Sequence, residues 1–228
     1  MIAIRSAAVR RTIRRVVPFV IVPALALSGA VLTERGQYAL VISLMCAASF
    51  LLFAAGFERK KTGARRLVVV SVMTALAVAG RFIPLVKPVA ALTIISALYL
   101  GGEAGFLTGA LTALVSNFYF GQGPWTPFQM MAWGLIGLFA GLLAVPLRQK
   151  KMLLLLYGLL AGIGYSMIMD VWTVLWYGQG FNGTLYLAAL ATALPHTVLY
   201  AVSNVIYLAL LARPFGEKLN RLRVKYGV

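Results

Sequence analysis

The stretch Leu100-Gly101-Gly102-Glu103-Ala104-Gly105 interrupts an apolar run that extends from Val89 to Phe120. Adjacent glycines weaken a helix, and a carboxylate exposed to lipid costs about 3 kcal/mol at the bilayer centre. This run is therefore better divided into two short helices, 88–100 and 104–120, with a turn between them. The turn decides the topology of the rest of the chain.

The composition outside this stretch is that of a membrane protein. Of 228 residues, 61% are hydrophobic and only 11% are charged. Runs such as Gln37 to Phe57 and Met152 to Tyr177 can cross a hydrocarbon core, which needs about 20 helical residues. The runs are continuously apolar rather than alternating, which indicates helices and not a barrel. The prediction is an all-α, polytopic membrane protein with spans at 16–34, 37–57, 67–84, 88–100, 104–120, 127–147, 152–177 and 184–212.

The net charge of +16 is gathered in a few places. Most Lys and Arg residues lie in four clusters, at 5–15, 59–66, 148–151 and 213–225. Clusters after every second span are typical of cytoplasmic loops, and this placement argues against nucleic acid as a partner. A turn at Gly101 puts all four clusters and both termini in the cytoplasm, whereas one long helix there would put the last two outside. The sequence thus predicts a multi-pass protein of the cell membrane, in contact with the lipid bilayer.

The first cluster and the apolar stretch after it also resemble a signal peptide. Ala24-Leu25-Ala26 is similar to a cleavage site. The apolar stretch is long for a signal peptide, so an uncleaved anchor is the preferred interpretation.

Aromatic and amide side chains gather in the three segments expected on the outer side, 81–88, 120–127 and 177–183. All four tryptophans lie in or near these segments. An aromatic belt would populate both interfaces, so a concave site for a flat organic ligand is the preferred interpretation. The predicted substrate-binding residues are Arg81, Lys87, Asn117, Tyr119, Gln122, Trp125, Gln129, Trp133, Asp170, Trp172, Trp176, Tyr177, Asn182 and His196.

Arg81 and Asp170 are the notable charges at membrane depth, and two interpretations stay open for them. They form a structural ion pair, or Arg81 and Lys87 meet an anionic or carbonyl-rich part of a ligand. His196 follows a proline within a helix and is either a packing residue or a ligand contact.

Small residues recur at a spacing of four. The pairs, which allow close helix packing inside the protein or against a partner, are Ala75/Ala79, Gly105/Gly109, Gly137/Gly141 and Gly158/Gly162.

Catalysis finds no support in the residue inventory. The chain has five acidic residues, one histidine and one cysteine, and it contains no HExxH, GxSxG or P-loop motif. A single cysteine permits neither an internal disulfide nor a thiolate metal cluster. We therefore expect no enzyme activity, no metal and no cofactor, and any uphill transport must be driven by another subunit.

From Arg66 onwards the chain resembles the substrate-binding S components of energy-coupling factor (ECF) vitamin transporters. The stretches that carry the resemblance are SVMTALAVAGRF (71–82), LGGEAGFLTG (100–109) and NFYFGQGPWTPFQM (117–130). The resemblance implies a six-helix substrate-binding core over 65–228 whose outer loops close over a vitamin. It also implies that Ala75 and Ala79 dock on a transmembrane scaffold subunit driven by two ATPase subunits. The basic segment and two-helix hairpin over 1–64 depart from that pattern.

The substrate suggested by the resemblance is cobalamin or a related corrinoid. LPHTVLYAVSN (194–204) and the tail VKYGV (224–228) are most similar to the cobalamin-type components. Arg81 and Lys87 leave a smaller carboxylate vitamin open. Arg81, Asp170 and His196 also suit a stand-alone channel or secondary transporter, and the small-residue faces suit an assembly subunit.

Overall fold

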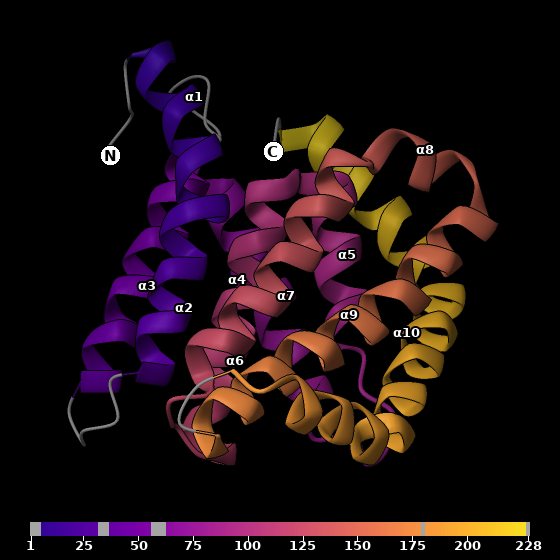
Figure 1. Cartoon of the computed structure of the whole chain (residues 1–228). Helices are drawn as coiled ribbons and strands as arrows, with labels where there is room; N and C mark the ends of the chain where they lie inside the picture. The colour runs from indigo at the N-terminus through magenta and orange to yellow at the C-terminus, as the bar shows by residue number, and fades with distance from the viewer. Residues whose placement is uncertain (1–5, 32–36, 56–62, 179–180, 227–228) are drawn as a thin grey trace.

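The computed structural model describes residues 6–31, 37–55, 63–178 and 181–226, and every regular element within them is a helix (Figure 1). The all-α prediction is thereby confirmed. The helices of the N-terminal part are α1 (Ala7–Val16), a π-helical segment (Val17–Ile21), α2 (Val22–Val31) and α3 (Gln37–Ala55). Those that follow are α4 (Gly63–Gly80), α5 (Val89–Leu100), α6 (Gly102–Phe120), α7 (Thr126–Leu142), α8 (Ala144–Gln149), α9 (Lys151–Tyr177) and α10 (Gly183–Tyr226).

The predicted turn at Gly101 separates α5 from α6. Gly101 has a φ of 95°, a backbone conformation that favours glycine because it has no Cβ. The charge that argued against a continuous helix is satisfied here, since Glu103 is buried and forms an ion pair with Arg14 of α1. Arg66 at the start of α4 donates a hydrogen bond to the Leu100 carbonyl.

The described residues of the four basic clusters lie at the end of the molecule that carries this turn. Arg14 reaches Glu103, and Arg65 donates to the Tyr226 carbonyl over 3.1 Å. The guanidinium carbon of Arg148 lies 5.8 Å from the ring centroid of Tyr99. We call this end, at the top of Figure 1, the inner end, and the opposite end the outer end.

Several helix ends differ from the predicted ones. The helix expected over 67–84 is α4, which begins at Gly63 and ends at Gly80. The span expected over 127–147 is broken after Leu142, because the ring of Pro146 in α8 clashes with the carbonyl four residues before it. The helix expected to end at 212 continues to Tyr226 and contains Pro195 and Pro214. Figure 1 shows α10 crossing the outer end, then rising along one edge and bending again near its end. Residues 32–34 and 56–57 of the first two predicted spans lie outside the described residues.

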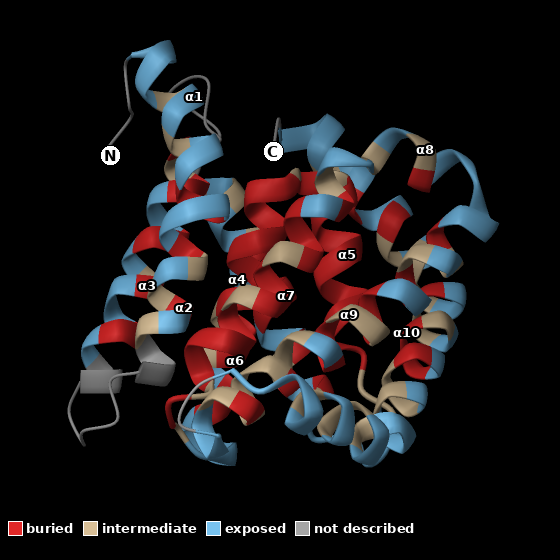
Figure 2. Cartoon of the chain, in the orientation of Figure 1, coloured by how far each residue is buried: buried red, intermediate tan, exposed pale blue. Residues whose placement is uncertain are grey.

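Helix α5 has only 12 residues, about 18 Å of helix, which is short for a bilayer. Eleven of its residues are buried, so protein and not lipid surrounds it. Figure 2 shows that the buried residues concentrate in α5, α6 and α7. By length and hydropathy, α9 and α10 qualify as membrane spans among the described residues, and shorter apolar helices cover 40–55, 89–100 and 126–142.

The N-terminal pair, α2 and α3, packs on one side of the other helices. It contacts α6, α7 and α9, and it stands at the left edge of Figure 1. Val22, Met45 and Leu52 are fully buried and belong to the same hydrophobic cluster as α5 and α7. The division of the chain into 1–64 and 65–228 stays a prediction.

Candidate functional site

Arg81 is the first residue after α4, and its side chain points back between α6 and α7. Its Nη1 donates to Ser116 Oγ and to Asn117 Oδ1, each over 2.5 Å. Its guanidinium carbon lies 4.7 Å from the ring centroid of Phe120 and 5.3 Å from that of Trp133. Two oxygen acceptors and two aromatic rings thus fix the cation at the outer end.

Amide side chains extend this contact into the bundle. Asn117 Nδ2 donates to Thr126 Oγ1 (2.9 Å) and to Gln129 Oε1 (2.8 Å). Gln129 Nε2 in turn donates to the Tyr165 hydroxyl over 3.1 Å. We call Arg81, Asn117, Gln129 and Tyr165 the polar ladder. It links the end of α4 with α6, α7 and α9, and such connected networks hold their members in one geometry.

Aromatic rings form a wall beside the polar ladder. Trp133 stacks on Tyr165 with ring centroids 5.1 Å apart and an interplanar angle of 9°. Tyr200 of α10 follows, with its centroid 5.0 Å from that of Tyr165. Trp133 Nε1 is buried and has no hydrogen-bond partner among the described residues. The site therefore combines a stacking surface with both donors and acceptors, the requirements of a flat ligand with polar edges.

Gln122 has a structural place beside the polar ladder. Its Nε2 donates to the Leu114 carbonyl over 2.8 Å, and its Oε1 accepts from Thr126 Oγ1 over 2.9 Å. Both ends of the amide are thus used to hold the loop between α6 and α7. This loop turns at Gly121, whose φ is 101°.

Lys87 approaches the polar ladder from the end of the outer loop 81–88. Its backbone N–H donates to Ser203 Oγ over 2.8 Å, which attaches the loop to α10. Its Nζ lies 5.8 Å from the ring centroid of Phe120, the ring that also contacts Arg81. Burial, and then the nearby Arg81 cation, lower the pKa of the Lys87 amine. Two positive charges thus converge beside one aromatic ring.

The other tryptophans form a separate row. Trp125 and Trp172 meet edge to face with centroids 5.9 Å apart, and Trp176 stacks on Trp172 at 6.0 Å. Trp172 packs in a hydrophobic cluster with Phe128 and Ala26 of the N-terminal pair. Tyr119 is exposed and packs against the Phe82 ring at 4.7 Å.

The remaining predicted site residues lie away from the polar ladder. Asp170 and Tyr177 line a groove between α9 and α10, and His196 is exposed. Asn182 accepts a hydrogen bond from the Leu185 N–H over 3.0 Å and so caps α10. The ion pairs found among the described residues are Arg14–Glu103 and Arg213–Glu217. The structural pair of Arg81 with Asp170 was therefore wrong, because the two side chains face different parts of the bundle.

The sequence analysis missed four members of the site: Ser116, Thr126, Tyr165 and Tyr200. Each of these residues carries a hydroxyl group and lies in or beside an apolar run. Such an isolated hydroxyl must find a partner inside the protein, and this was the available signal.

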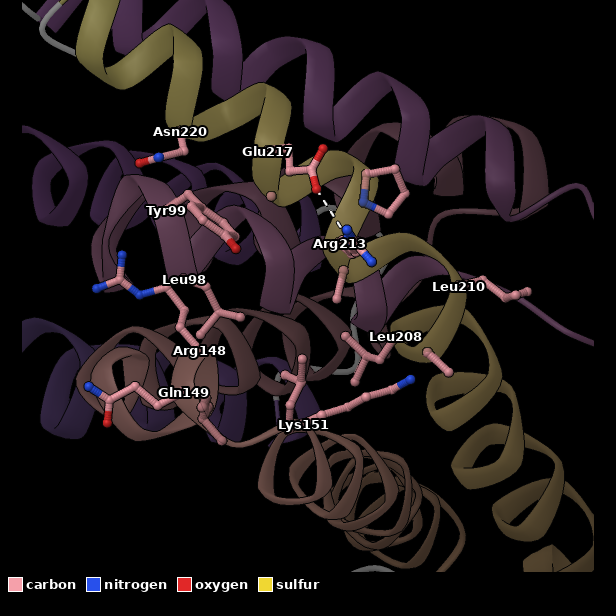
Figure 3. A pocket seen from close by; sticks show the side chains of 16 residues that line it. Leu98, Tyr99, Arg148, Gln149, Lys151, Leu208, Leu210, Arg213, Glu217 and Asn220 are labelled. Atoms are coloured by element: carbon pink, nitrogen blue, oxygen red, sulfur yellow. Dashed lines mark hydrogen bonds and ion pairs between the residues drawn. The ribbon is translucent and has the colours of Figure 1, made fainter.

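Two other grooves lie apart from the polar ladder. One of about 720 Å³ opens at the inner end between α8, the start of α9 and the bent end of α10, with Arg148, Lys151 and Arg213 around it (Figure 3). Another of about 710 Å³ runs along α4 and α6 and includes Ala75, Ala79 and Phe82.

The comparisons with known proteins concern α4 and the helices that follow it. The family model described as "ECF-type riboflavin transporter, S component" matches residues 61–221, from the start of α4 into α10. Searches of curated proteins and of solved structures each found no match. The matched segment is more than half of the chain, and it leaves α1 to α3 outside. The resemblance drawn from the sequence is thereby confirmed at the level of the family, which is one of membrane-embedded transport proteins and not of enzymes. The chain belongs to the family of ECF-type riboflavin transporter S components.

Proposed function

We propose that this chain captures a flat vitamin, riboflavin first of all, for an ECF-type importer. The observation that carries the proposal is the polar ladder lying against the stacked Trp133 and Tyr165 rings. The flavin ring system is planar and has carbonyl and N–H groups along one edge. A guanidinium, two amides and a hydroxyl can pair with such an edge while the aromatic rings stack on its face.

Cobalamin, the substrate expected from the sequence, is the second candidate. The outer tryptophan row and the amide-rich outer segments favour it, since a corrinoid is large and fringed with amides. The polar ladder favours the flavin, because its members bond to one another over 2.5–3.1 Å. The polar groups along one edge of a planar ring can replace these hydrogen bonds one by one. A corrinoid is bulkier and requires the outer loops to separate much further.

The proposed scaffold-docking surface is the groove on α4 and α6. Ala75 and Ala79 line it and are exposed, and Val72, about one turn before Ala75, is 53% exposed. The N-terminal pair lies mainly on α6, α7 and α9 and leaves this groove open. Small exposed side chains on a membrane helix let another helix approach closely. A scaffold helix in this groove, connected to two ATPase subunits, would supply the energy that the chain cannot obtain by itself.

The orientation follows from the charges. The inner end, with its four basic clusters, faces the cytoplasm, and both termini lie there. The polar ladder then begins at the outer end, on the side from which the vitamin is captured.

The test is binding of riboflavin and cobalamin to the full-length protein purified in detergent, measured by calorimetry. We expect riboflavin to bind, and Asn117→Leu to weaken binding at least about tenfold because it leaves the partners of the amide unpaired. Asn182→Ala is the matched control, since this amide caps α10 away from the polar ladder.

Three results would change the proposal. Binding of cobalamin alone would move it to the corrinoid. Binding of neither vitamin would remove it. Uptake of vitamin into liposomes by the purified chain without ATPase subunits would instead favour a stand-alone transporter.

A further inference from the structure

Asp170 is a buried carboxylate that the polar ladder does not use. Asp170 is 8% exposed, and its Oδ2 atom has no hydrogen-bond partner among the described residues. The carboxylate lines a groove of about 390 Å³ between α9 and α10. Burying an unpaired carboxylate is costly, so the group calls for a partner that enters the groove.

The walls of the groove show what kind of partner fits. Thr173, Thr192 and Tyr177, which carry hydroxyl groups, line it together with Asp170. The opposite wall on α10 is made of small residues, Ala188, Ala189 and Ala193, which leave the space open. The lining contains no Lys or Arg, so the protein itself supplies no counter-charge there. The hydroxyl groups of Thr173 and Thr192 donate to backbone carbonyls of their own helices, so towards the groove they can only accept. A chain of hydroxyl groups matches this lining, because each hydroxyl can donate to the carboxylate or to a threonine oxygen and accept from the Tyr177 hydroxyl.

The groove lies between the same two helices that carry Tyr165 and Tyr200, nearer to their outer ends. Asp170 follows Tyr165 by five residues, about 7.5 Å further along α9 towards the outer end. Thr192 precedes Tyr200 by eight residues on α10, with Pro195 between them. Between these levels Ser166 and Thr197 are hydrogen-bonded across the two helices at 2.5 Å. A ligand whose ring lies beside Tyr165 and Tyr200 would have to extend its side chain outward past this contact to reach the groove.

We propose that Asp170 and the α9–α10 groove bind the hydroxyl-bearing side chain of the vitamin, while the polar ladder binds its ring. This inference rests on the proposed function, because riboflavin carries such a polyhydroxyl chain on its ring. Asp170 thereby distinguishes riboflavin from flavins that lack the chain.

The experiment compares riboflavin with lumiflavin, which has the same ring and a methyl group in place of the polyhydroxyl chain. Affinities are measured for the full-length protein and for Asp170→Asn and Ala189→Leu. Asp170→Asn removes the charge at nearly constant volume, and Ala189→Leu fills the groove from the other wall. We expect each variant to weaken riboflavin binding about tenfold, the loss of one charge-assisted hydrogen bond, and to leave lumiflavin binding unchanged. Glu217→Gln at the inner end is the matched carboxylate control and should change neither affinity.

The outcomes separate this inference from the proposed function. Riboflavin binding that both variants leave intact, or wild-type protein that binds the two flavins equally, would overturn the assignment of the groove and leave the function standing. A protein that binds neither flavin removes both. Riboflavin binding that depends on Na⁺ or K⁺ in the wild type but not in Asp170→Asn would make Asp170 a cation ligand and would also overturn the inference.

Discussion

Two faces of this molecule carry small residues at the same spacing but have different surroundings. Between α6 and α7 the residues are glycines: a Cβ on Gly109 would lie 2.4 Å from the Trp133 carbonyl oxygen, and one on Gly137 would lie 2.4 Å from the Gly105 carbonyl carbon. On α4 they are Ala75 and Ala79, which are exposed and line an open groove of about 710 Å³. One face is filled by a neighbouring helix of the same chain, and the other is open.

The comparison shows that spacing alone does not tell internal packing from docking. In lipid, helices gain little from burying apolar surface against one another, so close backbone approach is an important source of attraction. Glycine is required where two backbones already touch, as in the α6–α7 seam. Alanine is sufficient on a helix face that contacts lipid until another subunit binds, because alanine stabilises the helix in the meantime.

The largest expected loss of stability comes from adding a side chain where α6 and α7 touch. Gly109→Val puts three carbons where the Trp133 backbone lies, so we expect α6 and α7 to separate and folding to be lost, at a cost of more than about 3 kcal/mol. Yield and thermal stability in detergent measure this. Gly164→Ala is the control, because its Cβ would meet nothing within 4 Å. Normal stability of Gly109→Val would mean that the seam is looser than described.

The sequence predicted depth along the helices much better than direction around them. The turn at Gly101 follows from local chemistry, as does the grouping of basic residues at one end. Arg81, Asn117, Gln129 and Trp133 were identified because polar and aromatic residues near an outer loop are conspicuous. The proline itself could have predicted the helix break before Pro146, but the apolar residues around it favoured one continuous span.

Direction around a helix axis depends on packing, which a single sequence does not reveal. Arg81 and Asp170 both lie in the outer half of their helical bundle, yet one faces α6 and α7 and the other faces α10. Tyr165 and Tyr200 were overlooked for the same reason, since only the packing of α9 and α10 turns both rings towards Trp133.

The open face is tested by filling it. Ala79→Trp places a large ring in the α4–α6 groove, so we expect assembly with the scaffold subunit to fall more than about tenfold while folding and vitamin binding stay normal. Co-purification with tagged scaffold and ATPase subunits measures assembly. The matched control is Ala47→Trp, an exposed alanine in the groove between α3 and α6. Equal loss in both variants would show that the α4 face has no special part in docking.

A smaller effect distinguishes rigid from yielding contacts in the α9–α10 seam. A Cβ on Gly162 would lie 2.6 Å from the Ala201 Cα, whereas one on Gly158 would lie 2.3 Å from the Leu208 Cδ1. A side-chain end can rotate away but a backbone atom cannot. We therefore expect Gly162→Ala to cost about 1–3 kcal/mol and Gly158→Ala clearly less. Thermal unfolding of the two variants measures the difference, and the reverse order would contradict this account of the seam.

The smallest effect concerns a joint held by charge rather than by close packing. Arg14 of α1 is half exposed and pairs with the buried Glu103 of α6, so it ties the N-terminal segment to the Gly101 turn. Arg14→Ala removes the positive charge that pairs with the buried Glu103 carboxylate. Because solvent already screens the half-exposed Arg14, we expect a loss of stability of only about 1 kcal/mol. Because the pair is an attraction between charges and Arg14 is half exposed, the difference between Arg14→Ala and wild type should shrink as the salt concentration rises. Arg15→Ala, which removes an exposed neighbouring charge, should show neither the loss nor its dependence on salt. A salt-independent loss in Arg14→Ala would mean that the arginine stabilises α1 by packing, and the joint would then be of the same kind as the glycine seam.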